Sequence, residues 1–216
     1  MKWETTIAVS LERPPEEVFV PGARHDPVRA AQYVDAIYGS QEYADRGTER
    51  MDLCPDEGLV CVGAYEGAVV LSDRNLFYKI DSDLHDRVLA ALPGSTCCFL
   101  LWPTDYSVLF RLYRDGRQVR QVFIIDEPSG GAAAESGDRL PEEELYWRHA
   151  PPPVDGEVSP LPFSAGDFAL EMMRAYAFGQ RPDQRGSDMM ALPVQQFSFA
   201  DTSRRLAMFL RRWRVR

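Results

Sequence analysis

The histidines and cysteines are the residues with which this chain could bind a metal or carry out nucleophilic catalysis. None of them has the H-x-H, H-E-x-x-H or C-x-x-C spacing that brings zinc ligands together, so the sequence predicts no metal site. The cysteines lie in or near apolar segments and are expected to be reduced and buried. A Cys–His nucleophile pair would have to form in space, and no G-x-S-x-G elbow offers an alternative. The residues concerned are His25, His85, His149, Cys54, Cys61, Cys97 and Cys98.

A second set of residues, Arg111, Tyr113 and Arg120, could bind an anion. Asp115-Gly116 separates two runs rich in Val, Phe, Tyr and Ile, which is the strongest short-range signal for a β-hairpin. If the loop has two residues, Arg111 lies opposite Arg120, with Tyr113 on the same face. Two adjacent guanidinium groups need an acidic neighbour or a bound anion, so the trio could hold a carboxylate or a phosphate.

The same register predicts that the other face of the hairpin is buried. Residues 97–102, just before the hairpin, form an apolar run short enough to be a strand buried on both faces. Three neighbouring strands are therefore expected, and they need helices to cover them. The hairpin residues predicted to be buried on one face are Phe110, Leu112, Val119 and Phe123.

Tyr146, Trp147 and Phe163 have two interpretations. They could line an aromatic ligand pocket, or they could anchor an extended segment, 146–163, to the core. Prolines at 151–153, 160 and 162 favour the extended anchor, because proline interrupts regular structure.

Residues 201–216 form the most unusual local feature, a basic amphipathic segment that includes Arg211, Arg212 and Trp213. Leu206 and Phe209 begin an apolar stripe at helical spacing, while most arginines point elsewhere. Such a segment could bind a membrane or a nucleic acid. We expect it instead to fold back onto the acidic surface of its own chain.

Composition restricts the classes of function. The chain has 216 residues, 45% of them hydrophobic, and a net charge of −9. This charge argues against a nucleic-acid surface on the body and suits a basic partner. The chain lacks a leader-like N-terminus and an apolar run of membrane-spanning length, so we expect a cytoplasmic protein without membrane contact. No cofactor is expected.

Periodicity and turn residues predict a single α+β domain over 1–216, with a mainly antiparallel sheet and helices packed against it. The glycine-rich part of 128–138 lacks the Lys-Ser/Thr of a phosphate-binding loop. Glu142, Glu143 and Glu144 are expected to start a solvated helix. The predicted strands are 3–11, 59–62, 68–71, 97–102, both arms of the hairpin and 194–199, and the predicted loops are 41–57 and 128–138. The predicted helices are 26–39, with Asp26 as N-cap and Pro27 in the first helical position, a segment from Ser82, and 168–178, which Ser164 or Asp167 begins.

Several segments resemble an uncharacterised bacterial family, found widely in high-GC actinobacteria. They include Gly63-Ala-Tyr-Glu-Gly67, the strand-turn-strand from Leu112 to Arg120, Tyr146-Trp147 and Leu161-Pro162-Phe163. The resemblance extends from Leu59 to Phe199, without 41–57 and the arginine-rich end. It implies one compact unit and no catalytic residue, since the family has no assigned activity.

These observations favour a non-enzymatic protein that binds another protein. A concrete version is an immunity-type protein whose acidic surface neutralises a basic effector enzyme. The alternatives are a small-ligand-binding protein or enzyme with a pocket beside the sheet, and a nucleic-acid-binding protein that uses the arginine-rich end.

Overall fold

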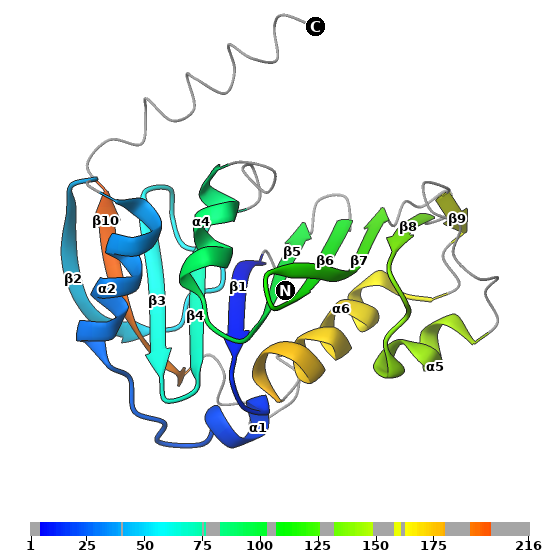
Figure 1. Ribbon diagram of the computed structural model, residues 1–216, viewed down its shortest axis with the longest axis horizontal. Helices are drawn as coiled ribbons and strands as arrows, with labels where there is room; N and C mark the ends of the chain where they lie inside the picture. Colours follow the sequence, from blue (N-terminus) through cyan, green and yellow to red (C-terminus); the bar gives the residue numbers. More distant parts are fainter. Residues whose placement is uncertain are drawn as a thin grey trace, which may run out of the picture.

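The hairpin belongs to an antiparallel sheet that contains ten strands within the described part of the chain (Figure 1). The computed structural model describes residues 5–39, 41–74, 76, 83–102, 107–125, 132–148, 158–160, 163–179 and 191–199. The order across the sheet is β2-β10-β3-β4-β1-β5-β6-β7-β8-β9. The strands are β1 (Thr5–Leu11), β2 (Tyr43–Arg50), β3 (Leu59–Tyr65), β4 (Ala68–Asp73), β5 (Ser95–Trp102), β6 (Ser107–Arg114), β7 (Arg117–Ile125), β8 (Ala132–Ser136), β9 (Val158–Pro160) and β10 (Pro193–Phe199).

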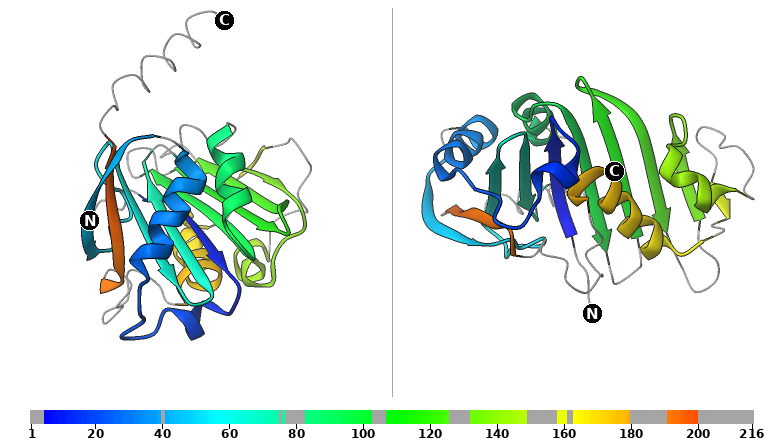
Figure 2. Two further views of the ribbon diagram at one scale, coloured as in Figure 1. Left: turned by 60° about the vertical axis from the view of Figure 1, so that its left-hand side comes forward. Right: turned by 90° about the horizontal axis from the view of Figure 1, so that it is seen from below.

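Helices pack on both faces of the sheet and give two hydrophobic cores (Figure 2). One core lies between the sheet and α6, η2, α1 and α5. The other lies beneath α2 and α4. The result is a single compact α+β domain, as the sequence predicts. The helices are α1 (Pro15–Val18), α2 (Pro27–Tyr38), α4 (Asp83–Ala91), α5 (Glu144–Trp147) and α6 (Ala165–Met173), with a 3-10 turn η1 (Pro141–Glu143) and a π-helical turn η2 (Arg174–Phe178).

The ends of the predicted helices are where their capping residues place them. The Asp26 carboxylate accepts hydrogen bonds from the amides of Val28 and Arg29, with Pro27 in the first helical position of α2. Gly39 ends α2 with a φ of +67°. Ser164 caps α6 in the same way, through the amide of Asp167.

The hairpin turn has the predicted backbone, with positive φ at Asp115 and Gly116. The predicted pairs Arg114–Arg117 and Tyr113–Gln118 are confirmed. A β-bulge then shifts the register, because Val119 is an extra residue on β7. Leu112 therefore lies opposite Arg120, and the predicted pairing of Arg111 with Arg120 is wrong.

The bulge also changes which side chains of β7 are buried. Phe110 and Leu112 are buried in the α6 core as predicted, and Val119 is half-buried against it. The prediction for Phe123 is wrong, because the shifted register turns its ring to the opposite face of the sheet, where it is half-exposed.

Two predicted loops contain strands. Residues 43–50 form the edge strand β2, which is polar along its length and pairs with β10. Residues 132–136 form β8, which pairs with β7. Neither segment has an alternating apolar pattern, so the ladder hydrogen bonds of a neighbouring strand decide their structure.

Only residues 146–148, 158–160 and 163 of the segment expected to be extended are described. The segment begins inside α5, and Val158–Pro160 form the short strand β9 beside β8. No helix in the described residues is long and apolar enough to cross a membrane.

Candidate interaction surface

Within the described residues, one half of the sheet has helices on only one of its faces. On the other face, α2 and α4 lie over the part of the sheet that contains β3, β4 and β1, and α4 also covers the end of β6 at Tyr113; no described helix lies over the rest of β6, over β7 or over β8 (Figure 2). We call this face of the three strands the open half-sheet. It is formed by Leu109 and Arg111 of β6, by Gln121, Phe123 and Ile125 of β7, and by Ala132, Ala134 and Ser136 of β8.

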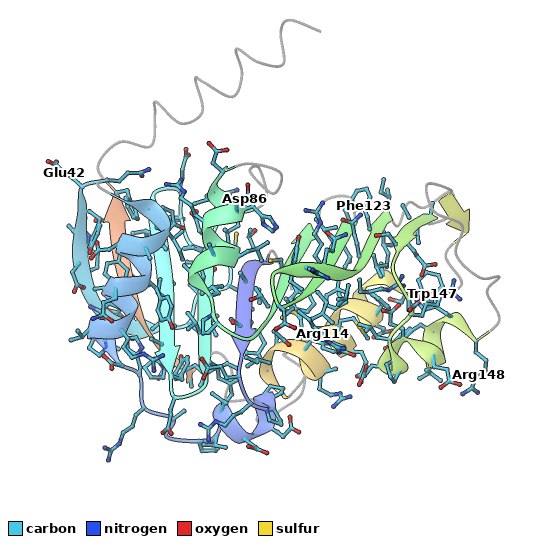
Figure 3. The ribbon with its side chains drawn as sticks, in the orientation of Figure 1. Glu42, Asp86, Arg114, Phe123, Trp147 and Arg148 are labelled. Carbon is cyan, nitrogen blue, oxygen red and sulfur yellow. The ribbon has the colours of Figure 1, made fainter. Side chains whose placement is uncertain are left out.

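The centre of the open half-sheet is apolar. Phe123 lies opposite Leu109 on β6 and opposite Ala134 on β8. Its ring is half-exposed on β7 (Figure 3), and Ile125 beside it is 37% exposed. A large aromatic side chain in this position resembles the anchors of protein–protein interfaces.

Polar groups lie beside this apolar centre. The Arg111 Nε donates to Gln121 Oε1 at 2.7 Å, across the β6–β7 pair. This bond ties the half-exposed guanidinium to the neighbouring strand. An apolar centre with polar neighbours is the usual composition of an interface.

Tyr113 lies where the open half-sheet meets α4. Its hydroxyl is 2.8 Å from His85 Nε2, and both side chains are buried. A weaker bond of 3.4 Å runs from the hydroxyl to Gln118. Arg111 and Tyr113 therefore share a face of the sheet, but Tyr113 is covered.

Arg120 lies on the opposite face and is completely buried. Its Nη2 is 2.5 Å from carboxylate oxygens of both Glu135 and Glu143. Its Nη1 donates to the carbonyl of Gly137 at 3.0 Å. Burial alone would lower the pKa of Arg120, but the hydrogen bonds and charges of the two glutamates outweigh burial and raise it.

This buried network corrects two expectations. The trio Arg111, Tyr113 and Arg120 does not converge on one anion, because the bulge puts Arg120 on the other face. Glu143 is not solvated; it is completely buried beside Arg120. Gly137 is required here, since a Cβ at this position would lie 2.1 Å from the carbonyl of the bulged Val119.

Tyr146 and Trp147 anchor η1 and α5 to α6. The Trp147 indole donates to Glu143 at 2.9 Å, and the Tyr146 hydroxyl donates to the carbonyl of Asp167 at 3.1 Å. Both rings meet Phe163 edge to face, with centroid distances of 4.6 and 5.1 Å. These contacts favour the anchoring role. Arg211, Arg212 and Trp213, the remaining candidate residues, lie outside the described residues.

The three buried thiols, Cys61, Cys97 and Cys98, are poor nucleophiles. Burial raises the pKa of both Cys61 and Cys98 to about 12, and it raises the pKa of Cys97 well above its usual value. The described residues contain no group of three or more His, Cys, Asp or Glu side chains that could hold a metal ion.

A family model described as "Family of unknown function (DUF6928)" matches residues 5–197. This range is wider than the resemblance from Leu59 to Phe199, since it includes β1, α2 and the segment 41–57. No curated protein and no solved structure matches the chain.

Proposed function

Because the chain belongs to this family of unknown function, its membership brings no activity, and we propose from its geometry that it is a non-enzymatic binding protein. Its partner is another protein, and the binding surface is the open half-sheet. The observation that carries this proposal is the half-exposed Phe123 in the apolar centre of a sheet face that no described helix covers.

The charge of the chain favours a basic partner. At a net charge of −9, two copies repel each other, whereas a cationic protein is attracted over long range. Such attraction raises the association rate and falls with ionic strength. The apolar centre around Phe123 then supplies the short-range affinity.

The narrower form of the proposal is an immunity-type role in a bacterial cytoplasm, where this protein would neutralise a basic effector enzyme. Its support is the acidity of the chain and the four cysteines, all of which are free thiols as in reducing compartments. It requires a gene for a basic protein next to the gene for this chain.

Two observations make the alternatives weaker. An enzyme or ligand site built from Arg111, Tyr113 and Arg120 is opposed by the bulge, which separates Arg120 from the others by the thickness of the sheet. A Cys–His nucleophile is opposed by the raised pKa of the buried thiols.

The test uses the product of the adjacent gene as a defined probe. Its dissociation constant with the full chain is measured by calorimetry for the unaltered protein and for Phe123→Arg. We expect the substitution to weaken binding by about 30-fold or more, because it places a charge in the centre of the interface. Val28→Arg on α2 is the matched control, since Val28 is 67% exposed and lies on a helix away from the open half-sheet.

Equal binding by Phe123→Arg and the unaltered protein would overturn the choice of surface. Absence of binding to any basic neighbouring product would overturn the immunity role. If light scattering shows a dimer that Phe123→Arg converts to monomer, a second copy occupies the surface and the proposed partner is wrong.

A further inference from the structure

A pocket of about 330 Å³ lies at the end of the sheet where β1 and β6 finish and β5 begins. It is separate from the open half-sheet and opens beside η2. Arg114, labelled in Figure 3, reaches it from the end of β6. The pocket is lined by Leu11, Glu12, Arg13, Pro14, Pro15, Ser95, Leu112, Arg114, Ala175 and Tyr176.

Two glycines hold the walls of this pocket close together. Gly94 has a φ of +71°, and a Cβ there would lie 2.2 Å from the carbonyl oxygen of Leu11. Gly179 has a φ of +71°, and a Cβ there would lie 2.8 Å from the amide nitrogen of Glu16. Gly94 thus brings the start of β5 against the end of β1, and Gly179 brings η2 against α1. Larger residues at either position would force these segments apart.

The π-helical turn sets the position of Tyr176. The amide of Gly179 donates to the carbonyl of Arg174 at 2.9 Å, which closes the wider turn. The thiol of Cys97 donates to the carbonyl of Tyr176 at 2.8 Å, and the Tyr176 hydroxyl donates to Glu142. Single π-helical turns occur often at functional sites. Here the turn fixes a tyrosine in the pocket wall with its only hydroxyl proton already committed.

The charged side chains that line the pocket carry both signs. Arg13 uses Nη2 to donate to the carbonyl of Glu66 at 2.7 Å. Among the described residues, neither the Glu12 carboxylate nor the Arg114 guanidinium forms a hydrogen bond or ion pair. Leu11, Leu112 and other carbon-rich residues supply the remaining surface.

We propose that this pocket binds a small zwitterionic ligand of the amino-acid class. Arg114 and Arg13 pair with the ligand's carboxylate, because guanidinium groups match carboxylate geometry. Glu12 pairs with its ammonium group, and the Tyr176 oxygen accepts a second hydrogen bond from that group. The apolar lining contacts the side chain, and the volume fits a small ligand. A simple phosphate or carboxylate fits less well, because Glu12 would repel it.

The experiment is an NMR titration of the full chain with the standard amino acids, followed through the amides of Ser95, Leu112 and Ala175. For L-leucine the matched probes are 4-methylpentanoate, which lacks the ammonium, and 3-methylbutylamine, which lacks the carboxylate; analogous pairs serve for other amino acids. We expect the best amino acid to bind about ten-fold or more tightly than either of its analogues. Inorganic phosphate is titrated as a further probe, because tight binding of phosphate would indicate a general anion site.

Two variants divide the roles of the charges. Glu12→Gln should reduce the affinity for the amino acid to that for its carboxylate analogue, and it should leave the affinity for the carboxylate analogue unchanged or higher. Arg114→Gln should lower the affinity for the amino acid and the affinity for its carboxylate analogue by similar factors. Glu17→Gln and Arg117→Gln are matched controls, because neither residue lines the pocket.

Three results would overturn the inference. One is that no amino acid shifts these amides. Another is that phosphate or the carboxylate analogue binds as tightly as the amino acid. The third is that the control variants change affinity as much as Glu12→Gln and Arg114→Gln.

Discussion

Arg120 and Glu143 form a two-point ion pair inside the core, with Nε 2.8 Å from Oε1 and Nη2 2.5 Å from Oε2. Both side chains have no exposed surface. The pair connects β7 to η1, and Glu135 on β8 adds a second carboxylate. It therefore holds the η1–α5 segment, with its aromatic anchors, against one end of the sheet.

We expect Arg120→Met to lower the free energy of unfolding by about 3–5 kcal/mol, because it leaves the buried Glu143 carboxylate without its cation and leaves Glu135 with only Arg139. Urea denaturation measures the change. The matched control is Arg117→Met, an exposed position on the same strand, which should change stability by less than about 0.5 kcal/mol. Replacing Glu143 with Leu in the Arg120→Met background should recover part of the loss. A loss below about 1 kcal/mol for Arg120→Met would show that the network is not stabilising as described.

Phe110 and Phe123 should respond differently to truncation. Phe110→Ala should cost about 3–5 kcal/mol, since its ring is fully enclosed between β6 and α6. Phe123→Ala should cost less than about 1.5 kcal/mol, because part of its ring is already in water. Equal costs in chemical denaturation would contradict the bulged register, and a cost below about 1 kcal/mol for Phe110 would mean that its side chain is not enclosed.

His25 should make the protein less stable as the pH falls. Its Nδ1 accepts a hydrogen bond from the amide of Ala64 at 3.2 Å, which requires a neutral imidazole, and burial lowers the pKa of His25 below 6.5. The unfolded chain therefore binds more protons than the folded chain below about pH 6.5, so stability is present above this pH and decreases as the pH falls toward the folded pKa.

The measurement is the free energy of unfolding at about pH 7.5 and about pH 5.5, a range that brackets the histidine pKa. His25→Gln keeps an acceptor for the Ala64 amide and removes the titrating group. The free energy of unfolding of this variant should therefore fall less between about pH 7.5 and about pH 5.5 than that of the unaltered protein. Arg24→Gln is the control, and its free energy of unfolding should fall between the two pH values as much as that of the unaltered protein. An identical loss in His25→Gln would exclude His25 as the source.

The cysteines should differ in reactivity. Cys61, Cys97 and Cys98 are buried and burial raises their pKa, whereas Cys54 is partly exposed. A colorimetric thiol reagent at about pH 8 should modify one thiol rapidly in the native protein and all four after denaturation. Cys54→Ser should remove the rapid phase. Rapid modification of two or more native thiols would contradict the burial of the strand cysteines.

The role of 201–216, outside the described residues, stays a prediction. If its arginines meet the chain's own carboxylates, removing 211–216 should lower stability modestly and leave affinity for DNA and RNA unchanged, since exposed pairs contribute about 0–1 kcal/mol each. A salt titration of nucleic-acid binding compares the full and shortened chains. Salt-sensitive binding by the full chain alone would instead assign this segment to nucleic acid.

The sequence alone determined those helices, strands and turns that are specified by residues close together in the chain. The Asp26-Pro27 start of α2, the Asp115-Gly116 turn, the helix after Ser164 and the apolar strand before the hairpin are all specified by capping, turn residues or periodicity. It also determined the fold class, because these elements require a sheet covered by helices. An acidic neighbour for Arg120 was also expected, but from a pairing with Arg111 that the structure does not contain.

Only the tertiary structure decided what depends on neighbouring strands. The polar strands β2 and β8 exist because β10 and β7 supply their hydrogen bonds, so no pattern within them could predict them. One extra residue, Val119, sent Arg120 into the core and Phe123 to the open half-sheet, because side chains alternate and a one-residue shift exchanges the two faces. The sequence contains that residue, but the carboxylates that pair with the buried Arg120, those of Glu135 and Glu143, come from β8 and η1, which lie outside the hairpin.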